Sequence, residues 1–407
     1  MHSLAFAAFA AVSFSFGCTS EKIVYKSGTD FAAPPAASKS FVGYYDEANK
    51  ATVCGSCHAE KQVAWKTTKH ARAWADLSAN TSKAGYCEAC HTVNNLGNAA
   101  TDSASGWRST KDARFHDVQC ESCHGAGLTH ASAPNATNRP LASIKADTNA
   151  TTGCGECHSG THNPFAREWK LSGHSATWEA SHNSTDPYCQ GCHTGQGALL
   201  VWQKGGNYAE KGSTNMEPAT CAVCHDPHGN TGVDKQLRFP LNAANLESNL
   251  CIKCHQRRGT SADAVSMGRN SVHSPEGPTL LGMAGWFPPG MSPADSLVAT
   301  HGSSTKNPKL CATCHVQAYQ GTDPVTKQAV FSTGHRFLAT PCVGANGLPL
   351  DSQTGCVAAN MTFRSCLASG CHGTETAARN AMNTANLRIA NLVTQANTLI
   401  KIGRAHV

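Results

Sequence analysis

The sequence contains few aromatic and few charged residues for a chain of 407, only 7% and 15% respectively. It lacks basic runs, and 33 Lys and Arg residues against 27 Asp and Glu leave a net charge of only +6, which argues against nucleic-acid binding. With 40% apolar residues the chain is neither the highly charged type that stays disordered nor a polytopic membrane protein. We therefore expect a folded chain whose core is completed by cofactors.

Cysteine and histidine, by contrast, are abundant, with 21 of each. Eight times, two cysteines separated by two residues are followed directly by histidine, the signature of c-type haem attachment. The two thiols add across the haem vinyl groups and the imidazole becomes the proximal iron ligand. Zinc ribbons and redox cysteine pairs do not need that histidine. The eight copies are Cys54, Cys57 and His58; Cys87, Cys90 and His91; Cys120, Cys123 and His124; Cys154, Cys157 and His158; Cys189, Cys192 and His193; Cys221, Cys224 and His225; Cys251, Cys254 and His255; and Cys311, Cys314 and His315.

A ninth motif is stretched, with four residues between Cys366 and Cys371, which precedes His372. It resembles a variant attachment motif of multihaem cytochromes, and a plain disulfide is the alternative. The sequence thus predicts nine covalently attached c-type haems per chain. Outside the motifs, Cys342 and Cys356 flank a turn-rich stretch and are predicted to form a disulfide, worth about 3 kcal/mol in the chain-entropy model. Two free thiols are the alternative.

Ten further histidines lie outside the motifs and the two chain ends. Ten candidates for nine irons favour a second, distal histidine on most irons. His116 and His182 are the least secure candidates, and one of them is expected to be surplus. If two of the ten were structural, one iron would keep an open position. We predict eight distal ligands: His70, His130, His162, His174, His228, His273, His301 and His335.

The N-terminal segment has the features of an export signal. Residues 1–17 carry an apolar run that is too short to span a bilayer comfortably and suits a signal peptide, although no Lys or Arg precedes Lys22. Cys18 resembles the lipidated cysteine of bacterial lipoproteins. Ser15 departs from that pattern, so a simply cleaved signal is the alternative. Residues 18–50 are expected to form a flexible tether.

An internal repeat with a period of roughly 100 residues follows. The segment Trp65–Trp74 matches the segment Trp169–Trp178, and His70 of the first corresponds to His174 of the second. Histidine and the following tryptophan are four residues apart, so we expect them on one helical face, with the imidazole reaching an iron and the indole packing on porphyrin. A role of both in an ordinary core is the alternative.

The repeat divides the chain into a trihaem module at 51–150, a second at 151–250, and a looser third segment at 251–373 with three haems. His228 follows the motif ending at His225 in a pattern that resembles multihaem proteins whose second histidine ligates a neighbouring haem. Residues 374–401 carry apolar residues at three- and four-residue spacing and are expected to form an amphipathic helix, packed on its own domain or in an oligomer contact. Residues 402–407 read like translated adapter DNA and are expected to be a non-native tail.

The motifs are connected by stretches rich in Gly, Ser, Thr, Asn and Pro. We expect a mainly α fold with much irregular loop and almost no β structure, organised around stacked haems. Together the motifs resemble the multihaem cytochrome c superfamily, which includes cytochrome c554, pentahaem nitrite reductase, hydroxylamine oxidoreductase and octahaem tetrathionate reductase. The resemblance covers roughly residues 51–375 and implies paired haems in a mainly α fold.

Three functions are compatible with this pattern. The favoured one is an exported carrier that passes electrons along a chain of mostly bis-histidine haems to redox partner proteins or an extracellular acceptor. A reductase of a small nitrogen or sulfur oxyanion with one five-coordinate haem is the alternative, and a cytochrome that polymerises by sharing ligands between copies is a third. Every motif ends in histidine, unlike the lysine of the nitrite reductases, so no catalytic residue is assigned. A periplasmic or cell-surface location in a bacterium is expected.

Overall fold

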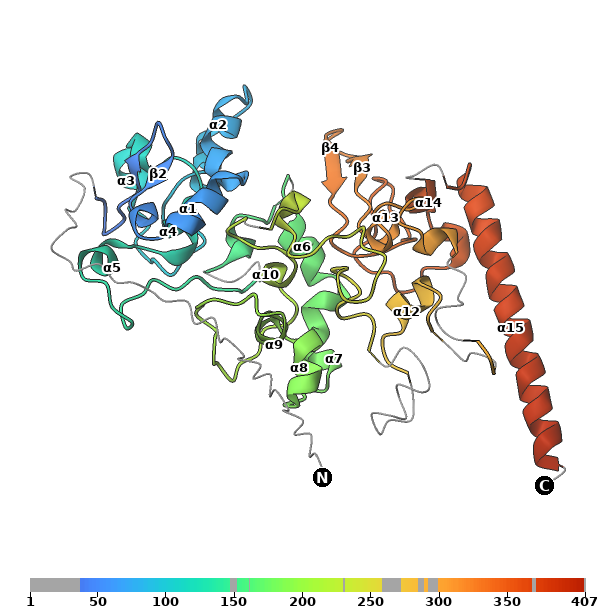
Figure 1. Cartoon of the computed structure of the whole chain (residues 1–407). Helices are drawn as coiled ribbons and strands as arrows, with labels where there is room; N and C mark the ends of the chain where they lie inside the picture. The colour runs from blue at the N-terminus through green and yellow to red at the C-terminus, as the bar shows by residue number, and fades with distance from the viewer. Residues whose placement is uncertain are drawn as a thin grey trace, which may run out of the picture.

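The chain is folded mainly from short helices joined by long loops, with two small sheets (Figure 1). The computed structural model describes residues 37–146, 152–160, 162–229, 231–257, 272–284, 289–291, 299–367 and 371–405. The helices are α1 (Ala59–Lys66), α2 (Ala73–Ser78), α3 (Trp107–Thr110), α4 (Cys120–His124), α5 (Leu128–Ser132), α6 (Phe165–Lys170), α7 (Thr177–Ala180), α8 (Pro187–His193), α9 (Gly195–Val201), α10 (Cys221–Cys224), α12 (Glu276–Leu280), α13 (Cys311–His315), α14 (Arg364–Leu367) and α15 (Glu375–Ala405). The strands are β1 (Tyr44–Asp46), β2 (Ala51–Thr52), β3 (Tyr319–Thr322) and β4 (Ala329–Ser332). The predicted fold class, mainly helical and loop-rich with almost no β structure, is confirmed.

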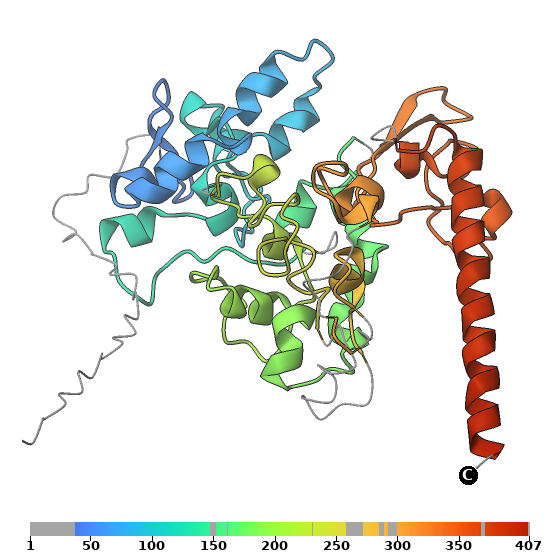
Figure 2. The ribbon, with the colours of Figure 1, turned by 45° about the vertical axis from the view of Figure 1, so that its right-hand side comes forward.

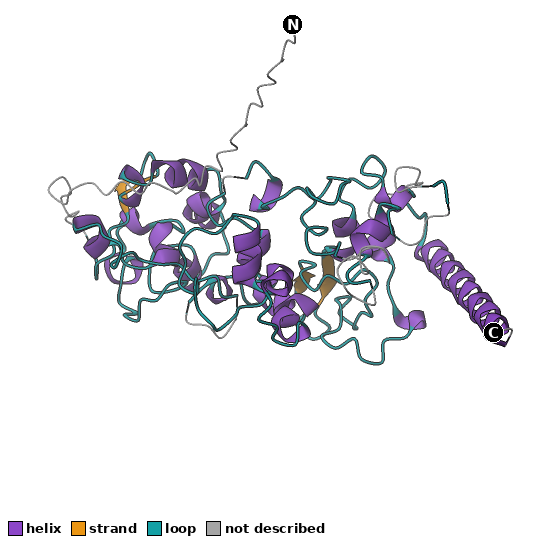
Figure 3. Ribbon diagram, turned by 60° about the horizontal axis from the view of Figure 1, so that its bottom comes forward, coloured by secondary structure: helices purple, strands orange, loops and turns teal. Residues whose placement is uncertain are grey.

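The elements follow one another across the molecule in chain order. α1 to α5 lie at one end, α6 to α10 in the middle, and α12 to α14 with the β3–β4 hairpin at the other end (Figure 1). Figure 3 shows that loops make up most of the path between the helices. Short helices bury little apolar surface on their own. The stability of the chain therefore depends on the groups that pack between the helices.

The apolar core is divided into small clusters. One contains Phe41, Val93, Trp107 and Phe115, and another contains only three buried residues, Tyr44, Trp65 and Ala71. A third, in the middle part, contains Ile144, Leu199 and Ala222. Clusters of three or four side chains cannot stabilise a chain of this length.

The predicted repeat is visible in the hydrogen bonds. The Trp65 indole nitrogen donates to the carbonyl of Val118 at 2.9 Å, and the Trp169 indole donates to Ala219 at 2.8 Å. Each acceptor lies two residues before the third cysteine motif of its module. The tryptophan therefore fastens the helix after the first motif to the third motif in both modules.

Two local expectations differ from the structure. His70 and Trp74 do not share one helix, because α1 ends at Lys66, His70 begins a 3-10 turn and α2 begins at Ala73. The Trp74 indole stacks on the His116 ring at 4.0 Å between centroids and contacts Trp107 at 4.8 Å. A four-residue spacing in the sequence did not reveal that the 3-10 turn at His70 passes into α2 between the two residues.

The expected tether ends earlier than residue 50. Phe41 and Val42 are fully buried and Tyr44 is 2% exposed. The Tyr44 hydroxyl donates to the buried Asp117 carboxylate at 2.8 Å, and Lys50 Nζ contacts the same carboxylate at 2.5 Å. This part of the chain belongs to the first module, while residues 1–36, with the signal peptide and Cys18, lie outside the described residues.

The C-terminal helix is present and extends away from the body of the molecule (Figures 1 and 2). α15 has 31 residues, and every residue from Asn383 to Ile402 is exposed. Within the described residues, no helix combines the length and the apolar character needed to cross a membrane. The predicted disulfide between Cys342 and Cys356 is also present.

Glu121 is a buried carboxylate within the third motif. It accepts hydrogen bonds from the backbone N–H groups of Val42, Gly43 and Gly127 at 2.8 to 3.0 Å. Burial nevertheless raises the pKa of Glu121 from 4.5 to about 7. The carboxylate ties the buried N-terminal segment to the third motif.

We predict that this carboxylate makes stability depend on pH. The pKa is raised on folding, so its contribution is greatest below the unfolded pKa and is lost as the pH rises through about 7. Between about pH 5 and about pH 8.5 the wild type should lose up to about 3 kcal/mol more unfolding free energy than Glu121→Gln. Denaturant unfolding at both pH values measures this, with the exposed Glu60→Gln as control. Equal losses in all three proteins would contradict the prediction.

We also predict that the chain without haem does not reach this structure, because its apolar clusters are too small. Chain produced in cells lacking haem attachment should show a largely unordered far-ultraviolet circular dichroism spectrum and no cooperative thermal transition. The haem-loaded protein in the same buffer is the control. A cooperative transition in the haem-free chain would show that side chains alone suffice.

Candidate haem-binding sites

The cysteine motifs sit on single helical turns. Those beginning at Cys120, Cys221 and Cys311 open α4, α10 and α13, and those at Cys54 and Cys154 begin 3-10 turns. Residues three apart on a helical turn lie on one face. Both thiols of a motif therefore point to the same side, with the imidazole next to them.

The eight regular motifs line one continuous cavity. Its volume is about 3540 Å³, and the proximal histidine of each regular motif is on its wall. A pocket for a single small ligand is about 300 to 1000 Å³, so this cavity has room for several large groups. Its lining is mainly apolar, which suits porphyrin faces.

Imidazole rings lie opposite each other in pairs, six of them on the lining of this cavity. In seven pairs, a proximal histidine and one outside the motifs have ring centroids 6.0 to 6.4 Å apart. When two imidazoles bind opposite sides of one metal ion, their ring centroids lie about 6 Å apart, because each bond from a ring nitrogen to the metal is about 2 Å long. The pairs are His58 with His130, His158 with His70, His124 with His228, His255 with His174, His193 with His273, His225 with His335, and His372 with His301.

These pairs fit iron in a macrocycle better than zinc. Within the described residues, no three His, Cys, Asp or Glu side chains come together as a metal site. Two imidazoles would supply only two of the ligands that an iron takes, so a porphyrin would supply the others. The residues present thus fit haem c, whose sulfur links would come from the adjacent cysteines.

Seven of the eight predicted distal histidines belong to these pairs, and His162 does not. His162 lines the cavity but faces no proximal ring at this spacing in the described part of the chain. Of the two uncertain histidines, His116 stacks on Trp74 and its Nδ1 lies 3.2 Å from Glu47, which accounts for it without iron. His182 lines the cavity with His162.

Two proximal histidines, His91 and His315, have no imidazole facing them among the described residues, which include every histidine except those at the two ends. Both rings are nevertheless oriented like the others. His91 Nδ1 hydrogen bonds to the Ala73 carbonyl at 2.8 Å and His315 Nδ1 to the Phe337 carbonyl at 2.9 Å.

Most proximal histidines are oriented by a backbone carbonyl. This fixes the tautomer, because Nδ1 carries the proton and Nε2 is free to bind metal. The bond from His91 to Ala73 recurs one module later from His193 to Thr177 at 2.8 Å. The remaining cases are His124 with Pro140 and His225 with Lys235, both at 2.8 Å.

Several of the predicted distal histidines are partly buried and neutral. Burial, with a neighbouring imidazole, lowers the pKa of His70, His174 and His335 to about 4. A neutral imidazole is the form that binds a metal. These side chains are therefore ready for iron at neutral pH without losing a proton.

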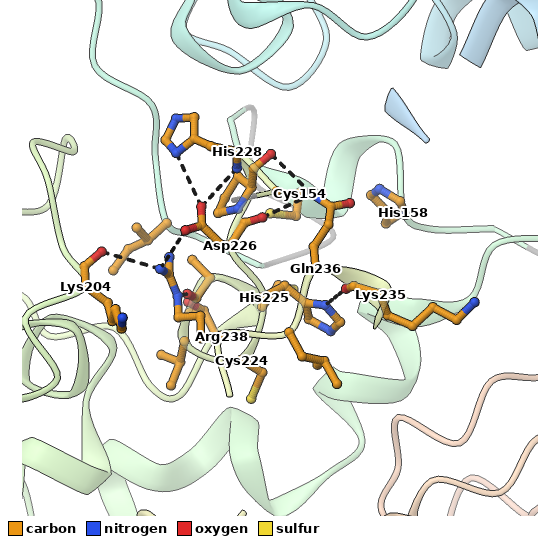
Figure 4. A pocket seen from close by; sticks show the side chains of 18 of the residues that line it. Cys154, His158, Lys204, Cys224, His225, Asp226, His228, Lys235, Gln236 and Arg238 are labelled. Atoms are coloured by element: carbon orange, nitrogen blue, oxygen red, sulfur yellow. Dashed lines mark hydrogen bonds and ion pairs between the residues drawn. The ribbon is translucent and has the colours of Figure 1, made fainter. Parts of the chain in front are cut away.

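Two of the paired histidines, His228 and His255, have carboxylate neighbours that sequence reasoning did not single out. Asp226 Oδ1 lies 3.4 Å from His228 Nδ1, and its other oxygen lies 3.3 Å from the buried Arg238 (Figure 4). Burial opposes the charge on Asp226, but hydrogen bonds from His228 and the charge of Arg238 outweigh it and lower the pKa of this carboxyl. His255 Nδ1 lies 3.5 Å from the more exposed Glu276. Asp226 lies between two predicted ligands in the sequence, His225 and His228, and this position could have identified it as a neighbour of a ligand.

Another missed carboxylate, Glu168 on α6, positions His335. It is buried and accepts from the backbone N–H of Thr333 and of His335 at 2.8 and 2.9 Å, and from the Thr333 hydroxyl at 2.8 Å. The Thr333 hydroxyl also lies 2.9 Å from His335 Nδ1. His335, a predicted ligand from the third segment, is thus held in place by Glu168 of the second module.

Comparisons with known proteins agree with this geometry. Residues 53–125 match the family of cytochrome c554 and c-prime, and residues 214–260 match the doubled CXXCH motif family. The C-type polyheme cytochromes OmcC and OmcB of Geobacter sulfurreducens are each 27% identical to this chain, over 57% and 51% of it. The chain spans less than a third of either relative, 30% and 31%. The crystal structure of the outer cell wall cytochrome OcwA matches with a TM-score of 0.54 at 17% identity, covering 90% of this chain and 91% of that one.

The Asp226 contact predicts a change in reduction potential. A carboxylate at Nδ1 makes a ligating imidazole a stronger donor and favours Fe(III). Asp226→Asn removes that charge and the ion-pair partner of Arg238, so the potential of a haem held by His124 and His228 should rise. A potentiometric titration followed by EPR should show one component shifted to higher potential. The exposed Asp234→Asn is the matched control, and an unshifted titration in Asp226→Asn would refute the prediction.

Proposed function

We propose that this chain, a multihaem c-type cytochrome, carries electrons along nine haems rather than transforming a substrate. The observation that carries the proposal is the set of seven facing imidazole pairs. An iron with two imidazole ligands has no open position for a substrate. Its only available chemistry is the gain and loss of an electron.

Each residue type has a separate task in this proposal. The cysteines of the motifs hold the group covalently, so it cannot dissociate during turnover. The proximal and distal histidines hold the iron between them, and the carbonyls, Asp226 and Glu276 orient those imidazoles. Haem c supplies an iron that alternates between Fe(III) and Fe(II). The apolar cavity lining excludes water from the haem faces and so influences the potentials.

The proposed location is outside the cytoplasm, in the periplasm or at the cell surface. Haem attachment through cysteines takes place there, and the similar protein OcwA is described as an outer cell wall cytochrome. Lipidation of Cys18 would anchor the chain to a membrane. The partners are redox proteins or an extracellular electron acceptor.

A second candidate function is supported by His91 and His315. Neither ring is faced by a second imidazole in the described part of the chain, so iron at either motif would have a free distal side. Such an iron could bind a small nitrogen or sulfur oxyanion, as the reductase alternative requires. His162 and His182 line the same cavity and are the histidines available to close these positions.

The spin states of the irons test the ligation on which both functions rest, and consumption of a substrate separates the two functions. We predict that low-temperature EPR of the oxidised protein, quantified against a pyridine haemochrome count, gives nine haems with seven low-spin irons and two high-spin irons. In a coulometric titration, the fully reduced protein should give nine electrons per chain to a soluble oxidant. A predominance of high-spin irons would overturn the carrier proposal. Steady consumption of nitrite or tetrathionate by the reduced protein would favour the reductase.

A further inference from the structure

Cysteines of different motifs lie next to each other at five places. The two thiols of each pair are near enough to influence each other, although none of the ten is disulfide-bonded. The pairs are Cys54 with Cys120, Cys154 with Cys221, Cys251 with Cys311, Cys90 with Cys157, and Cys192 with Cys254. Every haem would be bonded to its cysteines at a porphyrin edge, so neighbouring sulfurs bring two porphyrin edges together.

The five pairs fall into two classes. Three join the first cysteine of one motif to the first cysteine of another: Cys54 to Cys120, Cys154 to Cys221, and Cys251 to Cys311. The other two join second cysteines: Cys90 to Cys157 and Cys192 to Cys254. The motifs at Cys154 and Cys251 therefore have two neighbours each, one at either cysteine.

Contacts of other residues support the same neighbours. Thr52 Oγ1 lies 3.7 Å from Cys120 Sγ, which joins the first motif to the third. The Gly153 amide donates to the Gly97 carbonyl at 3.1 Å, which joins the fourth motif to the segment after the second. The Arg257 guanidinium lies 4.5 Å from the centre of the Tyr188 ring, which joins the seventh motif to the fifth.

Further contacts connect these pairs into one series. Cys123 is near Cys154, and Cys224 is near Cys251. At the far end α13 packs against α14, and Cys314 is near Cys366. The first two of these contacts lead from the third motif of a module to the first motif of the next segment, and the last leads from the motif at Cys311 to the motif at Cys366. In the third segment the motif at Cys311 takes the position that Cys120 and Cys221 hold in the modules.

We propose that seven motifs form one continuous series and that two stand beside it. The series runs through the motifs that begin at Cys54, Cys120, Cys154, Cys221, Cys251, Cys311 and Cys366. The motifs at Cys87 and Cys189 are side branches, attached at the motifs of Cys154 and Cys251. This order rests on the proposed function, because it says which motifs form the route of an electron between the two ends and which lie beside that route.

The distal ligands agree with this layout. His130, which follows the third motif, faces His58 of the first. His228, beside the sixth motif, faces His124 of the third, so these two motifs are also close. That contact offers a direct step from the third motif to the sixth, past the fourth. The motifs at Cys87 and Cys189 still lie outside the series.

The order can be tested by timing electron arrival at one end. Lys61 is exposed on α1 beside the first motif. It is replaced by cysteine, and this cysteine is labelled with a ruthenium photoreductant. Cys18→Ser is added so that the label has only one site. The excited label gives one electron to the nearest Fe(III), and a sacrificial amine restores the label. His301→Met gives the last haem a methionine ligand, which raises its potential and gives its ferric form a separate red absorption band. Bleaching of that band reports arrival.

Two matched variants of this parent then each lose one haem. Cys189→Ala with Cys192→Ala and His193→Ala removes a side branch, and Cys221→Ala with Cys224→Ala and His225→Ala removes a member of the series. We expect the first to keep the arrival rate of the parent and the second to lose fast arrival, while electrons still enter the first haem. Equal slowing in both, or fast arrival in the second, would overturn the order. No arrival in the labelled parent would instead overturn the carrier function itself.

Iron positions give a second test that needs no variant. Anomalous scattering from crystals of the haem-loaded protein locates all irons. The iron of the Cys189 motif should have the iron of the Cys251 motif as its nearest neighbour, and the iron of the Cys87 motif should be nearest to that of Cys154. A side iron lying between two successive irons of the series would overturn the proposal.

Discussion

The structure depends on a distance of about 6 Å between two imidazole rings that come from different parts of the chain. A motif brings its own proximal histidine, but the second ring has to be delivered by another segment. His70, for example, lies before the second motif and faces His158 of the fourth, and His174 faces His255 of the seventh. Short helices and loops suffice for this task, because each needs to hold only one ring in place. This explains how a chain with so few apolar contacts can have a defined fold.

The second constraint is the orientation of those rings. An imidazole that can rotate would bind iron weakly, and the chain prevents rotation with backbone carbonyls at His91, His124 and His193. Where a carboxylate replaces the carbonyl, as Asp226 does for His228, the same contact also influences the potential of the iron. Differences among otherwise similar haems can therefore arise from single side chains around them.

Much of this was predictable from the sequence, and the limits have physical causes. Motif identity, the repeat and the disulfide between Cys342 and Cys356 follow from local spacing, which covalent chemistry restricts strongly. The partner of each distal histidine depends on tertiary contacts, so the sequence could nominate His130 or His335 but not match them to irons. The burial of Phe41 and the stacking of His116 on Trp74 depend in the same way on segments far apart in the chain. His162 was nominated because it lies in a four-residue expansion of the second repeat copy, and no proximal ring faces it among the described residues.

The pairing of His70 with His158 and of His174 with His255 has a consequence for how such a chain can grow. Each module carries, shortly after its first motif, a histidine for the first motif of the module that follows. When a gene segment encoding one module is duplicated in tandem, the new copy therefore finds its distal ligand already present in the old one. Lengthening by whole modules would keep these ring pairs at the junction, whereas removal of a module from the N-terminal side would take one ring away from the next pair. Natural variation in haem number should then follow steps of whole modules.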